Sequence, residues 1–238
     1  MASPFANAYT FEFFSNERKF YMPKLSLTME EHTYEIHSYR IEYPVDAPNS
    51  LKIAILKDVF GTNCGNSFNT ATNNFLNNFM HSDDNPQLTT KFSKGSHISQ
   101  FIKVSGELVS QNKNLIVYKS SRSEYYVGAA HGMYGINYLN YYTPFQEALT
   151  ISDILLPPEE TSILQALHNN AQKVVDLLYS DDFSYIEISE SFFISSKGIT
   201  FVYQPYEIGP YASGIIEITI PKSQLTGCLT TLGQKLLK

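Results

Sequence analysis

Residues 203–221 read YQPYEIGPYASGIIEITIP, a run in which turn formers give way to strand formers. The two X-Pro steps restrict Gln204 and Gly209 to extended backbone. Gly214 can adopt a positive φ angle, which would turn the chain sharply. Isoleucines then alternate as one face of a strand: Ile216, Ile218 and Ile220. This stretch therefore predicts a loop, a corner and a strand.

Further strand-like and helix-like runs flank this stretch, but they come in groups and show no regular βαβ rhythm. Alternating or β-branched runs predict strands at about 34–43, 97–108, 114–121, 134–142, 192–194 and 199–203. Apolar spacing of three and four predicts a short helix at 49–60 and two main amphipathic helices, at 67–81 and from about 157 to 178, the latter with proline and acidic residues in its first turn. A closing helix or helical turn is expected at 224–237. The sequence predicts an α+β fold, a largely antiparallel sheet with the two main helices packed on it.

A second ordered motif lies upstream of the corner. It runs from Tyr126 through Gly128-Ala129-Ala130-His131-Gly132, and Asn137 and the segment 149–155 (LTISDIL) follow it. Together with the run from Tyr206 to Gly214, this order resembles a bacterial extracytoplasmic domain family of unknown function. Members of that family occur in the lysozyme-sensing anti-sigma factor RsiV and ahead of the deacetylase domain of PdaC. Here Ala129 stands where the family usually has glycine.

The resemblance covers about 118–229, and the tyrosine-rich strand ending at Pro44 resembles a companion domain that often precedes this one. It implies a companion-like subdomain at 1–110 and an RsiV/PdaC-like subdomain at 111–238, closely packed. It also implies a place outside the cytoplasmic membrane, in the periplasm or at the cell surface. Residues 1–7 lack the pattern of a secretory leader, so either the protein is cytoplasmic or a leader has been removed. The resemblance favours the second account, with Met1 as an expression start.

Composition narrows the classes of partner. The net charge is −6 and the acidic residues fall in short pairs, at 30–31, 83–84, 159–160 and 181–182. Nucleic acid requires a basic surface, so nucleic acid is disfavoured as a partner. The pairs fit solvated turns and helix starts, or the steering of a basic protein partner. No apolar run reaches the roughly 20 residues of a membrane-spanning helix, and the two cysteines, Cys64 and Cys228, favour buried free thiols over a disulfide.

The candidate binding residues are aromatic, amide and acidic side chains in the two motifs and between them. Tyrosine offers a large contact area with a polar tip, which suits a protein or sugar partner, although alternation turns about half of such side chains into the core. His131 has no second ligand or base nearby, so a structural role is favoured for it. Glu207 and Tyr211 could form part of a ligand-facing loop, but a role in holding a tight turn is favoured for both, because the motif consists mostly of residues that shape the backbone. The candidates are Tyr126, His131, Tyr134, Asn137, Tyr138, Tyr206, Glu207 and Tyr211.

Catalytic motifs are missing from the sequence. It contains no Gly-x-Ser-x-Gly, no His-Glu-x-x-His, no phosphate-binding glycine loop and no dinucleotide fingerprint, so we expect neither a cofactor nor a metal. The leading hypothesis is a non-catalytic extracytoplasmic module that binds a protein, such as a lysozyme, or a peptidoglycan-type glycan. The alternatives are a cell-wall hydrolase or deacetylase built around His131 and Glu207, and a structural envelope lipoprotein.

Overall fold

The computed structural model describes residues 8–21, 34–78, 100–158 and 162–238. The chain divides into two compact units. The N-terminal unit comprises Thr10–Glu107 and Ser120–Tyr134, and the C-terminal unit comprises Leu108–Lys119, Gly135–Lys238 and the residues up to Tyr9. Strands β3, β4 and β5 contribute residues to both units, so the division follows spatial contacts and not one point in the sequence.

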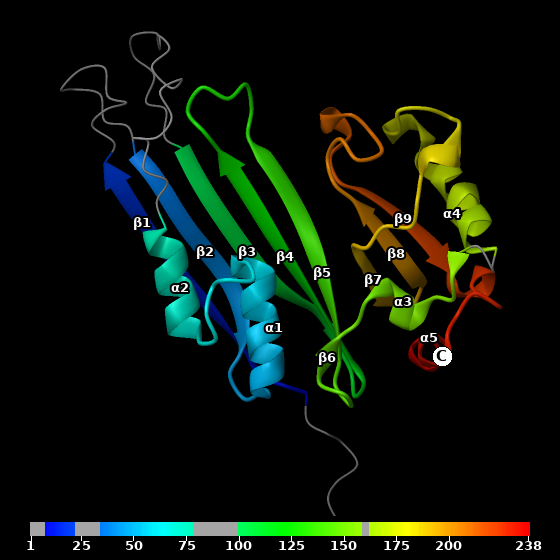
Figure 1. The fold of residues 1–238 in the computed structure, drawn as a ribbon, viewed down its shortest axis with the longest axis horizontal. Coiled ribbons are helices and arrows are strands. Elements are labelled where there is room, and N and C mark those ends of the chain that lie inside the picture. The colour runs from blue at the N-terminus through cyan, green and yellow to red at the C-terminus, as the bar shows by residue number, and fades with distance from the viewer. Residues whose placement is uncertain (1–7, 22–33, 79–99, 159–161) are drawn as a thin grey trace, which may run out of the picture. The chain divides into compact units, whose positions relative to one another are not determined.

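Six strands form the larger sheet in the order β1-β2-β3-β4-β5-β6 (Figure 1). Their bounds are β1 (Phe11–Tyr21), β2 (Tyr34–Pro44), β3 (Gln100–Gln111), β4 (Leu115–Tyr125), β5 (Met133–Tyr142) and β6 (Glu147–Ala148). Strand β2 pairs antiparallel with β1 and parallel with β3, because two helices and a crossover separate β2 from β3 along the chain. The predicted class, α+β with a mostly antiparallel sheet, is confirmed.

Helices α1 (Asn49–Phe60) and α2 (Phe68–Asn77) cover one face of the sheet in the N-terminal unit (Figure 1). The Oγ of Ser67 accepts a hydrogen bond from the backbone N–H of Thr70 and so caps the first turn of α2. The amide-rich side of α2 is exposed, as predicted, while Phe75 on its other side is buried. The helix ends at Asn77, earlier than expected, and residues 79–81 lie outside the described residues.

The core of the N-terminal unit is largely aromatic. Phe68 of α2 packs against Phe14 of β1 and Tyr43 of β2, with ring centroids 4.8 and 4.9 Å apart. Tyr39 meets Phe60 edge-on at 5.7 Å. Such ring pairs contribute about 0.5–1.5 kcal/mol each beyond the burial of their area, so they fix both helices on the sheet.

Three strands form the sheet of the C-terminal unit: β7 (Phe192–Ser195), β8 (Gly198–Tyr203) and β9 (Ile216–Pro221), all antiparallel. Every residue of the central strand β8 is buried. The predicted hairpin is confirmed, and Gly198 has φ +147° there. A Cβ on Gly198 would lie 2.1 Å from the carbonyl oxygen of Ile220, so β9 needs a glycine at this position to approach so closely.

Short helices complete the C-terminal unit: α3 (Ile151–Ile154), α4 (Ile163–Ala171) and α5 (Thr231–Leu236), with 3-10 turns at 172–177, 183–185, 211–213 and 222–224. The prediction of one regular helix from about 157 to 178 was wrong at both ends, because α4 begins only at Ile163 and the second half is not regular. Val174 has φ −125° and ψ 20°, so the chain kinks and tightens to 3-10 geometry after Ala171. Apolar spacing of three and four suits both kinds of turn, and for this reason the pattern did not show the break.

The sequence also led to predictions about the acidic pairs, the two cysteines and membrane-spanning helices. Of the acidic pairs, those at 30–31, 83–84 and 159–160 lie outside the described residues, as do residues 97–99 of one predicted strand. Cys64 and Cys228 both carry free, buried thiols. Among the helices described, none is long and apolar enough to cross a membrane.

Candidate functional site

The candidate residues are divided between the two units. Tyr126, His131 and Tyr134 belong to the N-terminal unit, where they lie in or beside the loop between β4 and β5. Asn137, Tyr138, Tyr206, Glu207 and Tyr211 belong to the C-terminal unit. His131 and the corner at 206–211 are therefore features of different units, and each is described in its own surroundings.

The glycine-rich loop of the N-terminal unit turns through Gly128, which has φ +94°. The backbone N–H of Ala129 donates to the carbonyl oxygen of Tyr126 at 3.0 Å and closes the turn. A Cβ on Gly132 would lie 2.9 Å from the carbonyl oxygen of Glu124. The small residues of this motif thus let the two ends of the loop approach each other.

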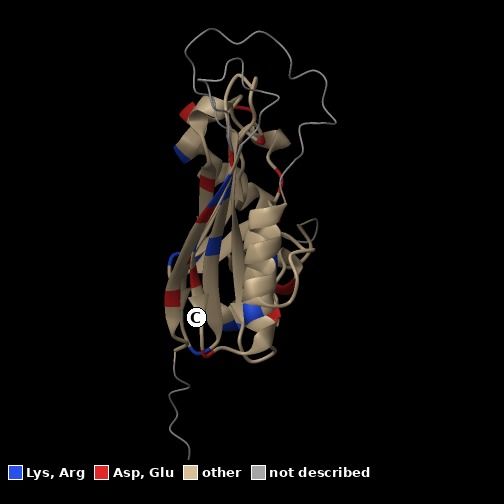
Figure 2. Ribbon diagram, turned by 90° about the vertical axis from the view of Figure 1, so that its left-hand side faces the viewer, with Lys and Arg blue, Asp and Glu red and all other residues tan. Residues whose placement is uncertain are grey.

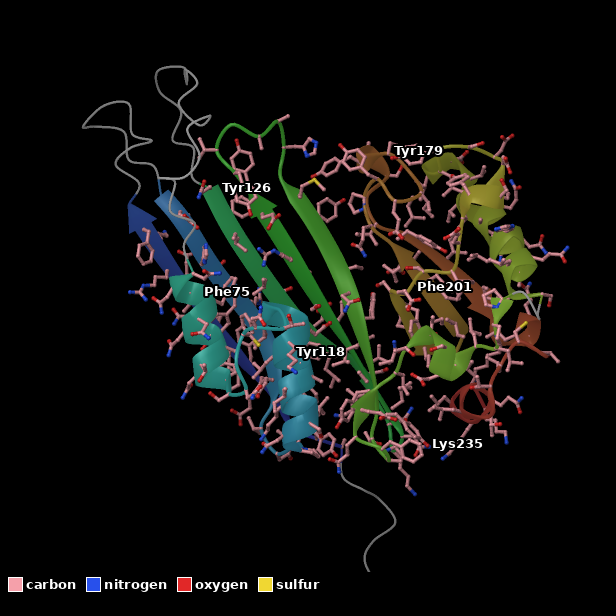
Figure 3. All side chains as sticks on the ribbon, viewed as in Figure 1. Phe75, Tyr118, Tyr126, Tyr179, Phe201 and Lys235 are labelled. Carbon is pink, nitrogen blue, oxygen red and sulfur yellow. The ribbon has the colours of Figure 1, made fainter. Side chains whose placement is uncertain are left out.

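His131 is exposed in this loop, and its Nδ1 donates to the carbonyl oxygen of Gly132 at 2.9 Å. Across the described part of the chain, no group of three or more His, Cys, Asp or Glu side chains is arranged to hold a metal ion. Tyr126 lies at the end of β4 (Figure 3), where burial and then the charge of Glu124 raise the pKa of its phenol. Tyr134 is 38% exposed.

The corner of the C-terminal unit is held by its own polar groups. The carboxylate of Glu207 accepts a hydrogen bond from the backbone N–H of Gln204 at 2.7 Å. The N–H of Glu207 donates to the Gln204 carbonyl, and the N–H of Tyr206 donates to the Gly209 carbonyl. Within this turn Tyr206 has φ +74°, a conformation that costs a non-glycine residue energy and that persists only where the surroundings fix it.

The corner is also fixed to strand β5 by the side chain of Gln204. Its Oε1 accepts from the backbone N–H of Ile136 at 3.0 Å, and its Nε2 donates to the carbonyl of the same residue at 2.8 Å. A Cβ at Gly135 would lie only 2.9 Å from this Oε1. The amide occupies the place of a partner strand along this part of β5, so the corner is a preformed structure.

Four tyrosines surround this corner, and we call the surface that they form the tyrosine corner: Tyr179, Tyr185, Tyr206 and Tyr211. Tyr206 is 50% exposed and Tyr179 is 54% exposed, and Figure 3 labels Tyr179 near the loop between β8 and β9. The hydroxyl of Tyr179 donates to the carbonyl of Tyr206 at 3.3 Å. The hydroxyl of Tyr185 donates to the carbonyl of Ile208 at 3.1 Å. The rings of Tyr206 and Tyr211 lie 5.5 Å apart.

The sequence prediction missed Tyr179 and Tyr185, which reach the corner from a segment some 20 to 30 positions earlier. A signal was present, since both residues flank the exposed pair Asp181-Asp182 in a stretch without helical or strand periodicity. An aromatic residue in such a stretch has no core face to occupy, so exposure of its ring is expected. The hydrogen bonds to the corner, in contrast, depend on the tertiary fold.

Asn137 and Tyr138 lie on β5. The ring of Tyr138 packs on Phe193 at 4.4 Å, and its hydroxyl is 3.5 Å from the carboxylate of Glu217. The Oδ1 of Asn137 accepts a long hydrogen bond from Ser191 at 3.4 Å. These contacts link β5 to the three-stranded sheet.

The ionisable groups Tyr203 and Glu207 of the corner are both engaged in hydrogen bonds to backbone. Burial, and then the charge of Glu207, raise the pKa of Tyr203 above its ordinary value. Its phenol therefore stays neutral and donates to the carbonyl of Glu187 at 2.7 Å. Glu207 is exposed and engaged with backbone. The corner therefore presents exposed tyrosine rings on a backbone held by hydrogen bonds.

Comparison with known proteins gives a consistent picture of the fold. No curated protein matches the chain. The crystal structure of a DUF3298 family member from Bacteroides fragilis shares 22% identity, covers 98% of this chain and 99% of its own, and has a TM-score of 0.77. The crystal structure of a DUF3298 family protein from Pseudomonas aeruginosa shares 17% identity, with 94% and 96% coverage and a TM-score of 0.64. These two likenesses show a common fold over nearly the whole chain.

The family model described as "Protein of unknown function (DUF3298)" matches residues 141–223. That range contains β7, β8, β9 and the whole tyrosine corner. The family match and the two structural matches confirm the resemblance read from the sequence. Residues 141–223 thus carry the DUF3298 domain, the RsiV/PdaC-like domain.

Proposed function

We propose that this chain is a non-catalytic binding module of the bacterial cell envelope, outside the cytoplasmic membrane, and that its tyrosine corner recognises a basic protein. A lysozyme is the partner that we would test first, since the family resemblance points to it. The observation that carries the proposal is the exposed set of rings at a corner whose backbone is held by hydrogen bonds.

Exposed tyrosines on a rigid loop are suited to recognition. Interfaces are enriched in tyrosine, because its ring buries a large area and loses little rotamer freedom. Tyr179 and Tyr185 donate their hydroxyls to the backbone of the loop that carries Tyr206, so three rings are held together before any partner arrives. Preorganisation of this kind lowers the entropy cost of binding.

The charge around the corner favours a basic partner. Between residues 176 and 211 the chain carries six carboxylates and one lysine, and Asp181, Asp182 and Glu207 are exposed. Such a field would speed the approach of a basic protein and would weaken with salt. Along the long strands, in contrast, residues of both signs are interspersed (Figure 2), which is unlike the basic surface that nucleic acid needs.

Titration calorimetry of the purified chain with lysozyme, at low and at high salt, tests this proposal. We expect binding that weakens with salt and that falls about thirtyfold in Tyr206→Ala, the loss of about 2 kcal/mol typical of a central interface aromatic. Asp181→Asn should mainly slow association. Phe145→Ala is the matched control, because Phe145 is 69% exposed on the same unit but lies outside the corner.

Three outcomes would contradict the proposal. Equal loss of binding in Tyr206→Ala and Phe145→Ala would show that the corner is not the contact surface. Absence of any heat with lysozyme and with other basic proteins would remove the basic partner. Turnover of peptidoglycan or of an acetylated glycan by the purified chain would favour the enzymatic alternative.

A further inference from the structure

The N-terminal unit contains a cavity of about 670 Å³, and no residue of the tyrosine corner lines it. It lies among the ends of α1 and α2 and the strands beneath them, and its lining includes His37, Phe60, Asn63, Asn74, Asn78 and Arg122. Ligand sites for small molecules have volumes of roughly 300–1,000 Å³, so the cavity can hold one. This inference goes beyond the proposed function and does not depend on it.

A buried polar network forms one side of this cavity. The Nε2 of His37 lies 2.8 Å from Oε1 of Glu35, and both side chains are almost fully buried. The other carboxylate oxygen of Glu35 accepts from Gln100 Nε2 at 3.0 Å. The Nδ1 of His37 donates to the carbonyl of Phe75, in the last turn of α2, at 2.9 Å. These bonds fix the imidazole, so the polar side of the cavity is rigid.

The walls around the imidazole both donate and accept hydrogen bonds. Helices α1 and α2 end at Phe60 and Asn77, and the last carbonyl groups of a helix point beyond its end as acceptors. The amide side chains of Asn63, Asn74 and Asn78 each offer an oxygen and an NH₂ group. Phe60 and Phe75, whose ring centroids are 5.4 Å apart, add apolar surface.

The charges in the lining oppose ligands with a large charge of either sign. Among the described residues that line the cavity, Arg122 is positive and none carries a carboxylate, which disfavours a cation. The negative ends of the two helix dipoles disfavour an anion. A ligand with many hydroxyl groups suits such walls, because each hydroxyl can donate to a carbonyl and accept from an amide or a guanidinium.

We propose that this cavity is a binding site for a short neutral saccharide, a mono- or disaccharide unit. Asn63, Asn74, Asn78 and the helix-end carbonyls bind its hydroxyls, Arg122 donates to a ring or hydroxyl oxygen, and Phe60 packs against its apolar face. Cavities of this composition bind weakly and reversibly, so the expected dissociation constants are in the millimolar range.

Titration of the ¹⁵N-labelled full chain with N,N′-diacetylchitobiose, cellobiose and glucosamine tests the proposal by NMR. We expect the two neutral disaccharides to shift the backbone amides of residues 60–64 and 74–78, and the cationic glucosamine to bind more weakly. Arg122→Gln should weaken disaccharide binding about tenfold, as expected for the loss of a charged hydrogen bond. Arg122 is half exposed, so the variant should stay folded.

Arg40→Gln is the matched control, because Arg40 lies on β2 but lines a separate cavity with Ser38 and Lys103. Its binding should equal that of the unchanged protein. The proposal is overturned if neither disaccharide moves these amides at tens of millimolar, or if Arg122→Gln and Arg40→Gln bind equally well. Preferred binding of glucosamine would also overturn it. Tyr206→Ala should leave the disaccharide titration unchanged, which separates this site from the tyrosine corner.

Discussion

The amide side chain of Gln204 makes two hydrogen bonds to the backbone of Ile136, one through each of its polar atoms. The amide therefore replaces a neighbouring strand beside β5, because it forms hydrogen bonds with both the N–H and the C=O of Ile136. An open strand edge can pair with other chains, and covering it prevents this. The same contact fixes the corner that carries Tyr206, so sheet structure and recognition surface depend on one side chain.

Replacing Gln204 with alanine should lower the free energy of unfolding by about 1–3 kcal/mol, because a partly buried N–H and C=O lose their partners. Urea denaturation followed by circular dichroism measures this. Gln165→Ala is the control: Gln165 is exposed on α4, and its replacement should change stability by about 0.5 kcal/mol or less. A Gln204→Ala variant as stable as the control would contradict the role assigned to this amide.

Asn140 repeats the arrangement in a fully buried setting. Its Nδ2 donates to the carbonyl of Phe192 at 2.7 Å, and its Oδ1 accepts from the N–H of Ile194 at 3.1 Å. Asn140→Ala should cost about 2–4 kcal/mol, more than Gln204→Ala, because the groups that it abandons are out of reach of water. Exposed Asn169→Ala on α4 is the comparison, and thermal unfolding of the two variants should differ by several degrees.

Local pattern was sufficient to predict most elements of this fold. The corner at 203–221 forms as the prolines, glycines and isoleucines predicted: Gly214 has φ +70°, and Ile216, Ile218 and Ile220 are buried. These features depend on the conformational preferences of single residues and on alternation, which a sequence shows directly. The positive φ of Tyr206 was not predicted, because it is imposed by the hydrogen bonds of Gln204, Glu207 and Gly209.

The burial of Glu35 and His37 could have been predicted from the alternation of side chains along β2. Positions 35, 37, 39, 41 and 43 of β2 share one buried face, so the rings at 39 and 43 put the carboxylate and the imidazole inside as well. Tyr34 and Ile36 are also large, but they are out of phase with Tyr39, so size alone does not show which face of the strand is buried. The partners of the pair, Gln100 and Phe75, come from other elements, and only the tertiary structure reveals them.

Glu35→Gln tests the contribution of this pair to stability. The substitution keeps the shape but leaves a buried imidazole facing an amide, so we expect a loss of about 3 kcal/mol in the free energy of unfolding. Chemical denaturation gives the value, with exposed Glu17→Gln on β1 as the control. A loss below about 1 kcal/mol would mean that the contact between Glu35 and His37 adds little to the stability of the fold.

The stability of the N-terminal unit should fall in strong alkali. Burial, and then the nearby Cys64, raise the pKa of Tyr43 to about 12, whereas an unfolded chain titrates near 10. The folded state thus holds this proton more tightly. Its contribution is complete below pH 10 and is lost as the pH rises towards 12, with about 1 kcal/mol already lost by pH 11. Urea melts at pH 9 and pH 11 should show the fall, and Tyr43→Phe should reduce it.

Replacing Gly209 with alanine should distort the tyrosine corner, because there is no room for a Cβ at this position. A Cβ there would lie 2.2 Å from the carbonyl oxygen of Leu177 and 2.7 Å from Cδ1 of Ile216, so the backbone beneath Tyr179 would have to move. At Gly227, φ is +79° but a Cβ would meet nothing within 4 Å. Gly227→Ala therefore incurs only the backbone cost of about 1 kcal/mol, whereas Gly209→Ala should cost about 3 kcal/mol or more.

The pair of glycine variants also distinguishes shape from stability in recognition. Gly209→Ala should weaken lysozyme binding at a temperature where the variant is still folded, because the carbonyls that orient Tyr179 and Tyr185 shift with the backbone. Gly227→Ala should bind as the unchanged chain does. Calorimetry at 10 °C, after circular dichroism has established that both variants are folded, gives the answer. Equal affinity in the two variants would show that the geometry of the corner does not control binding.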